Sequence, residues 1–135
     1  MQRNNLLKLL SLTALTLLSS ASFAHENPDQ TGTCYIFKNN QLKAKQSCVI
    51  KTGGGAGGMY TILQIGQNSY RFETSTMSED YPTVYYETDS KTKEVVEYSR
   101  NSKTLRILSN QQMDKAKDPL WCYKSKDNIL DICSN

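Results

Sequence analysis

MYTILQIGQNSYRFET, residues 59–74, is the stretch of the chain that decides its fold class. Apolar side chains occupy both faces of 59–65 at a period of two residues, which is typical of a strand covered on both sides. Turn-forming residues follow at 66–68, and aromatic and charged side chains then alternate over 69–74. This alternation indicates a half-buried second strand, so the stretch predicts a β-hairpin.

Short aromatic and β-branched segments recur on both sides of this hairpin and are separated by polar turns: 34–38, 47–52, 83–87, 94–99, 105–108, 120–124 and 129–133. Their spacing predicts an all-β fold, a small antiparallel meander that closes into a barrel or a sandwich. We expect at most one short helix, over residues 110–117, where Asn110 can cap a turn or two before Pro119 ends them.

The first 24 residues are typical of a cleavable signal peptide. Arg3 and Lys8 precede an apolar stretch at 9–18, and Ser22 and Ala24 stand at the two critical positions of a small-residue cleavage site. The apolar stretch is about half the roughly 20 residues that a membrane-spanning helix needs. We therefore expect a protein without a membrane anchor, located in the periplasm or secreted.

Cleavage at this site would leave His25 as the new N-terminus. Residues 25–33 (HENPDQTGT) are wholly polar and include a proline and a glycine, so we expect a flexible leader there. Residues 34–135 are then one β domain, because a chain of this length supports a single hydrophobic core.

The four cysteines, Cys34, Cys48, Cys122 and Cys133, predict two disulfides, because an even count in a small exported chain indicates a disulfide framework. Their spacing contains no C-x-x-C pair, which disfavours zinc. Each pair flanks a predicted hairpin, so we expect Cys34 to bond Cys48 and Cys122 to bond Cys133. The first hairpin is centred on Gln41 and needs a bulge or a longer loop.

Charge and histidine content exclude several classes of function. Removal of Arg3 and Lys8 with the signal peptide leaves 14 basic against 13 acidic residues, so no basic surface for nucleic acid is expected. His25 is the only histidine, which excludes catalytic sites that need an imidazole held inside a fold. We therefore predict a protein that is not an enzyme and uses no cofactor or metal.

A cluster of tyrosines is the first candidate for binding. Tyr81, Tyr85 and Tyr86 lie close together in the sequence, and tyrosines concentrate at binding surfaces because they combine a rigid apolar ring with a polar tip. Adjacent residues of a strand face opposite sides, so one of Tyr85 and Tyr86 should be core and the other exposed.

A glycine-rich loop at 53–58 (GGGAGG) is the second candidate, through Gly53, Gly54, Gly55, Gly57 and Gly58. The run fits G-x-G-x-x-G, but a strand rather than a helix follows it, which argues against a dinucleotide site. Either a positive φ or a close approach of another strand would explain so many glycines.

Two parts of the chain carry a resemblance: VIKTGGGAGG at 49–58 with Tyr60, and Trp121-Cys122-Tyr123 with Cys133. Together with the first cysteine pair they resemble a group of small exported bacterial proteins of unassigned function, which implies a shared scaffold. In size, compartment, strand content and cysteine use, the chain is also similar to the periplasmic inhibitors of lysozyme, small β-barrels that plug the cleft of the enzyme. This looser similarity implies an inhibitor and assigns no site residue.

We therefore expect a non-catalytic protein of inhibitor or immunity type that binds a macromolecule, with an extracytoplasmic protein as partner. The alternative is a small-ligand or envelope-associated binding module that uses the glycine-rich loop. In either case we expect a monomer.

Overall fold

The predicted hairpin is present as β4 (Gly58–Ile65) and β5 (Asn68–Ser75), joined by a turn in which Gly66 has a φ of 59°. The computed structural model describes residues 24–75, 77 and 83–135. Leu63, Ile65 and Phe72 of the hairpin are buried, and every second residue of the two strands faces the same side. Aromatic and branched residues in alternation thus place one face of the hairpin in the core.

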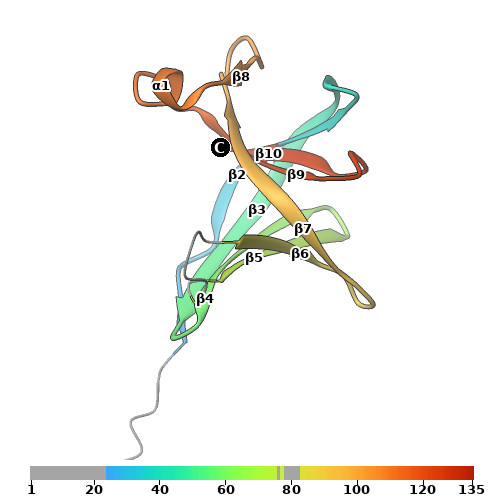
Figure 1. Ribbon diagram of the computed structural model, residues 1–135, viewed down its shortest axis with the longest axis vertical. Helices are drawn as coiled ribbons and strands as arrows, with labels where there is room; N and C mark the ends of the chain where they lie inside the picture. The colour runs from blue at the N-terminus through green and yellow to red at the C-terminus, as the bar shows by residue number, and fades with distance from the viewer. Residues whose placement is uncertain (1–23, 76, 78–82) are drawn as a thin grey trace, which may run out of the picture.

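The remaining elements continue the meander: β1 (His25–Glu26), β2 (Gln30–Lys38), β3 (Gln41–Gly55), β6 (Thr83–Glu87), β7 (Thr92–Arg100), β8 (Ile107–Leu108), α1 (Asn110–Met113), β9 (Leu120–Ser125) and β10 (Asp131–Ser134). Each long strand pairs antiparallel with the next along the chain, and β10 pairs with β2. The structure is therefore a closed barrel of eight strands rather than a sandwich (Figure 1). The short β1 and β8 pair with β3 and β7.

The first core lies in the barrel interior and fills part of it. Buried apolar side chains from strands all around the barrel meet there: Cys34, Cys48, Leu63, Ile65, Phe72, Val84, Val95 and Ile132. The rings of Phe72 and Tyr123 stack with centroids 3.9 Å apart and planes inclined by 9°. The two rings bury their faces against each other and so contribute to the apolar core.

A second core lies on the outer face of β2, β9 and β10. It contains Tyr35, Phe37, Leu120, Cys122 and Cys133, with Tyr98 and Leu105 packed against it. All four residues of β10 are buried as a result.

The two-sided coverage predicted for 59–65 was thus wrong for that segment and is found at β10 instead. The side chain of Met59 is 60% exposed, and Tyr60 and Ile62 are only partly buried. The reason is that the chain between β7 and β9 covers the barrel near β10, as the contact of Leu105 with the second core shows.

Both predicted disulfides are present, and each lies in a different core. Cys34 and Cys48 join β2 to β3 inside the barrel, with Cα atoms 5.7 Å apart. Cys122 and Cys133 stand directly opposite each other on β9 and β10, in the second core. The bulge expected in the first hairpin is present as a register shift between Ile36 and Phe37.

The prediction of a flexible leader at 25–33 was wrong for most of its length, because 25–26 and 30–33 lie in strands of the sheet and only 27–29 lie between them. Residues 30–33 begin β2 and pair with 47–50 of β3, and β1 pairs with Gly53 and Gly54. The side-chain amide of Asn27 also donates a hydrogen bond to the Thr52 hydroxyl at 2.9 Å. A polar segment can join a sheet because backbone hydrogen bonds hold it there without apolar side chains.

The helix is shorter than predicted and is capped one residue earlier. Ser109 is the N-cap, and its side chain and that of Gln112 satisfy each other's backbone N–H groups in a capping box. Asn110 is instead the first helical residue, and α1 ends at Met113. None of the helices formed by the described residues is long and apolar enough to cross a membrane.

A buried ion pair lies in the second core and contacts several of its residues. Arg100 and Asp131, 2% and 3% exposed, approach to 3.3 Å. The Arg100 guanidinium also donates to the Asn40 side chain and the Leu105 carbonyl, and it lies 3.9 Å from the centre of the Phe37 ring. Burial and the hydrogen bond to Asp131 raise the pKa of Tyr98, which keeps its hydroxyl protonated as a donor to that carboxylate.

Removing one partner of this pair should destabilise the fold strongly, because the other charge stays buried and unpaired. We expect Asp131→Ala and Arg100→Met each to lower the free energy of unfolding by about 3–5 kcal/mol in urea denaturation. The double variant should lose clearly less than the sum of the two. Fully additive losses would show that the two side chains do not interact.

Glu97 brings a carboxylate to the inward face of β7, two residues after Val95 and directly opposite Tyr123 of β9. Partial desolvation on this face raises the pKa of Glu97 above its ordinary value. The side chain is nevertheless exposed to solvent, so the effect on stability is small. A carboxyl with a raised pKa in the folded state favours folding while it is protonated and opposes folding once it ionises.

Glu97→Gln should therefore raise the free energy of unfolding at neutral pH. The gain should vanish below about pH 4, where the carboxyl is protonated in both the folded and the unfolded chain. Urea denaturation of both proteins at several pH values measures this. An equal gain at acidic and neutral pH would instead assign the effect to packing.

Candidate functional site

The glycine run forms the ends of two paired strands rather than a loop. β3 extends to Gly55, β4 begins at Gly58, and only Ala56 and Gly57 make the turn. Within the described residues, positive φ among glycines occurs at Gly66 alone, outside the run. Of the two explanations for the glycines, close approach is therefore the one that applies.

Two glycines of the run make room for a neighbour. A Cβ on Gly53 would collide with the ring of Tyr60, its partner across the strand pair. A Cβ on Gly58 would collide with the backbone carbonyl of Thr74 on β5. Gly57 differs, because a Cβ there would meet no atom within 4 Å. The run therefore packs tightly on one side and leaves its tip unobstructed.

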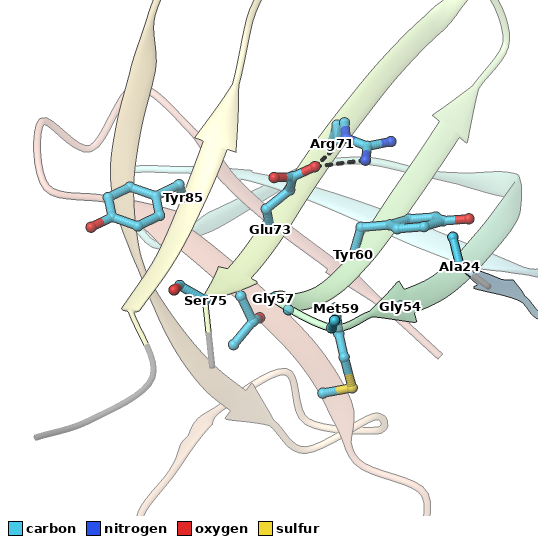
Figure 2. Close-up of a pocket in the computed structure, with 13 residues that line it drawn as sticks. Ala24, Gly54, Gly57, Met59, Tyr60, Arg71, Glu73, Ser75 and Tyr85 are labelled. Atoms are coloured by element: carbon cyan, nitrogen blue, oxygen red, sulfur yellow. Dashed lines mark hydrogen bonds and ion pairs between the residues drawn. The ribbon is translucent and has the colours of Figure 1, made fainter. Parts of the chain in front are cut away.

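A pocket of about 440 Å³ lies beside this hairpin (Figure 2). Its wall includes both kinds of residue that the sequence singled out for binding: Gly54, Gly55, Gly57, Gly58 and Tyr85. The rest of the lining consists of Ala24, Ala56, Met59, Tyr60, Arg71, Glu73, Thr74 and Ser75. The structure thus brings together two predicted features that are far apart in the sequence, whereas Gly53 lies under Tyr60 and does not line the pocket.

The tyrosine pair divides as predicted. Tyr86 faces the barrel interior, where its ring centre lies 5.5 Å from that of Phe72 and 6.2 Å from that of Tyr70. Burial, and then the nearby Tyr70, raise the pKa of Tyr86. Tyr85 is 37% exposed on the outer face and lines the pocket. Tyr81 lies outside the described residues.

A cross-strand row of side chains sets the shape of the pocket. Tyr60 of β4 pairs with Glu73 of β5, which pairs with Tyr85 of β6. Figure 2 shows the two tyrosines on opposite sides of the pocket, with Glu73 between them. Because these residues stand on paired strands, their positions are fixed by the barrel and not by a mobile loop.

Arg71 holds this row in place, and sequence reasoning did not identify it as a site residue. Its guanidinium donates to Glu73 at 2.6 Å, approaches Glu87 at 3.3 Å and lies 4.6 Å from the centre of the Tyr60 ring. The only signal in the sequence was that Arg71 and Glu73 alternate with buried aromatics on one strand. The three charged side chains are about 40% exposed, so their ion pairs add little stability.

The lining of the pocket combines aromatic, charged and glycine residues. Aromatic faces, exposed backbone and an ion pair surround the pocket, and none of its lining residues is a histidine or a cysteine. Among the described residues, no group of three or more His, Cys, Asp or Glu side chains could hold a metal ion. No family model, curated protein or solved structure matches the chain. Its function must therefore be inferred from its own residues.

Alanine substitutions at two neighbouring glycines should distinguish a tightly packed position from one that faces open space. We expect Gly58→Ala to lower the melting temperature by several degrees, because its Cβ would meet the Thr74 carbonyl. Gly57→Ala should leave the melting temperature unchanged within about 2 °C, since its Cβ would meet open space. Thermal unfolding followed by circular dichroism measures both. Equal losses would contradict the tight packing assigned to Gly58.

Proposed function

We propose that the protein is a non-catalytic extracytoplasmic binding protein of inhibitor or immunity type, which contacts a macromolecular partner through the glycine hairpin and Tyr85. The observation that carries this proposal is the convergence of the glycine run and Tyr85 on one pocket. Two disulfides in a small barrel fit an oxidising compartment.

The chemistry of the pocket suits contact with a protein surface. Tyr60 and Tyr85 present rigid aromatic area, which orders at low entropic cost on binding. Met59, which is 60% exposed, adds a flexible apolar side chain that adapts to a partner. The bare backbone at Gly54, Gly55 and Gly57 allows a partner to approach closely and to meet peptide groups directly.

The hairpin also suits the role of an inhibitor. β3 is 15 residues long, and its pairing with β4 continues to Gly55 and Gly58, so the narrow tip at Ala56 and Gly57 is held by a regular ladder. A narrow, preorganised projection can enter a cleft with little loss of entropy. A projection of this kind fits the role of inhibitor that the resemblance to the periplasmic inhibitors of lysozyme implies.

The proposal extends to the mature N-terminus. Ala24 lines the pocket, and its Cα would lie 3.8 Å from a Cβ on Gly55. Cleavage of the predicted signal peptide after Ala24 would remove this residue and leave the α-amino group of His25 at the edge of the pocket. The wall of the pocket in the exported protein would therefore lack Ala24.

A small-ligand or envelope-associated module remains the alternative, and the volume of the pocket favours it. About 440 Å³ lies within the range of roughly 300–1,000 Å³ that is usual for small-molecule sites.

Capture of partners from a periplasmic extract tests the proposal, with the mature protein immobilised. Wild type should retain one protein in stoichiometric amount. Tyr85→Ala should weaken its capture about tenfold, because an exposed aromatic anchor is lost. Gly57→Trp should abolish capture by filling the pocket from a position where a side chain meets no other atom.

Gln67→Trp is the matched control, since it adds the same side chain to the exposed turn at the other end of β4. It should capture the partner as wild type does. Capture that is unaffected by Tyr85→Ala and Gly57→Trp would place the interface elsewhere. Absence of a protein partner, together with a melting shift caused by a low-molecular-weight fraction of the extract, would favour the alternative.

A further inference from the structure

A second and larger cavity, of about 690 Å³, opens beside β9. Two of its lining residues belong to the inward side of the barrel: Thr61 lies on the same face of β4 as Leu63, and Tyr123 stacks on Phe72. The cavity is therefore the unfilled part of the barrel interior. It shares no lining residue with the hairpin pocket, so a ligand bound here is independent of the function proposed for that pocket.

Trp121 stands at the edge of this cavity and is the only tryptophan of the chain. It is 56% exposed, although it lies on the same face of β9 as the interior residue Tyr123. Tyr123 is fixed by its stacking on Phe72. The cavity thus has one immobilised aromatic ring and, two residues away, an indole that other side chains leave uncovered.

The rest of the lining is hydroxylic, amidic or acidic: Gln30, Thr52, Thr61, Asp118, Ser134 and Asn135, beside the apolar Ile50 and Pro119. No lysine or arginine belongs to this lining among the residues that the structure describes. An anionic ligand would meet no compensating charge here, and an apolar tail would leave the hydroxyl and amide groups without partners.

We infer that this cavity binds an uncharged saccharide, with one sugar ring stacked on Trp121 and its hydroxyls hydrogen-bonded to the polar lining. Pyranose rings present apolar C–H faces that pack on an aromatic plane, while their edges carry hydroxyls that both donate and accept. Thr52, Thr61 and Tyr123 supply hydroxyls on three different strands around the cavity. A volume of 690 Å³ accommodates a disaccharide.

Because Trp121 is the only tryptophan, intrinsic fluorescence reports this site directly. Titration of the full mature protein with N,N′-diacetylchitobiose and with cellobiose should give a saturable change in emission for at least one of the two. The Kd should be on the order of 1 mM, as expected for a small polar ligand in an open site. Choline and N-phenyl-1-naphthylamine, titrated in the same way, test an organic cation and an apolar ligand.

Calorimetry of variants then checks the position of the sugar. Trp121→Ala should raise the Kd at least about tenfold, because the stacking surface is lost. Thr61→Val should weaken binding while keeping the shape of the side chain. Ile107→Ala is the matched control, since it truncates a residue that is 50% exposed on β8, outside this lining, and it should bind as wild type does.

Melting temperatures close to that of wild type should show that the Trp121 and Thr61 variants are folded. Saturable binding of choline or of the naphthylamine without binding of either disaccharide would overturn the inference. So would disaccharide binding that Trp121→Ala leaves unchanged, or no binding of any of the four probes. None of these results bears on the hairpin pocket, which is tested by capture of a protein partner.

Discussion

The pairing of β2 with β10 is the contact on which the rest of the structure depends. It joins the first and last long strands, through Cys34 with Ser134, Tyr35 with Cys133 and Ile36 with Ile132. Without it both strands would be open sheet edges, which invite pairing with other chains. Each of the two strands also carries one cysteine of a disulfide to its other neighbour, β3 or β9. Covalent links therefore flank the seam on both sides, one inside the barrel and one outside.

The outer face of the barrel is covered differently at the β2–β10 seam and on β4, β5 and β6. Around the seam the outer face is covered by the second core, in which Arg100 and Asp131 are buried together. On β4, β5 and β6 the outer face carries side chains that are only partly buried, including Tyr60, Arg71 and Tyr85. Figure 1 shows β8 and α1 at the opposite end of the molecule from the β3–β4 turn. The hairpin pocket thus lies on a part of the barrel that the residues described by the structure leave uncovered.

The glycine run and the aromatic residues of the pocket depend on each other for their packing. Gly53 lacks the side chain that would displace Tyr60, and Tyr60 in turn supports the Arg71 guanidinium. Arg71 bonds Glu73, the residue between the two tyrosines of the pocket. Backbone pairing and side-chain packing therefore fix the shape of the pocket before any partner arrives, and such preorganisation is what a binding surface needs in order to limit its entropic cost.

Local features were predictable from the order of the residues: most strand segments, the turn at Gly66 and both disulfides. They were predictable because alternation, turn residues and cysteine spacing within a hairpin act between residues close along the chain. The irregularity of the first hairpin was predictable for the same reason, as a bulge or a longer loop, whereas the glycine run left positive φ and close approach as alternatives that the structure decided. Alternation reports which face a side chain takes, however, and not what covers that face.

The burial of β10 on both sides came only from the tertiary structure, because Leu105 and Arg100 reach it from another part of the chain. The pairing of Arg100 with Asp131 was likewise visible only in the tertiary structure. A buried charge needs a partner, but no sequence pattern indicates which residue that partner is. Strand pairing also placed the polar residues 25–26 and 30–33 in the sheet, because the backbone groups that form its hydrogen bonds are the same in nearly every residue. The proximity of the glycine hairpin to Tyr85 was also decided only by the tertiary structure. It depends on the order of β3 to β6 around the barrel and not on any motif within these strands.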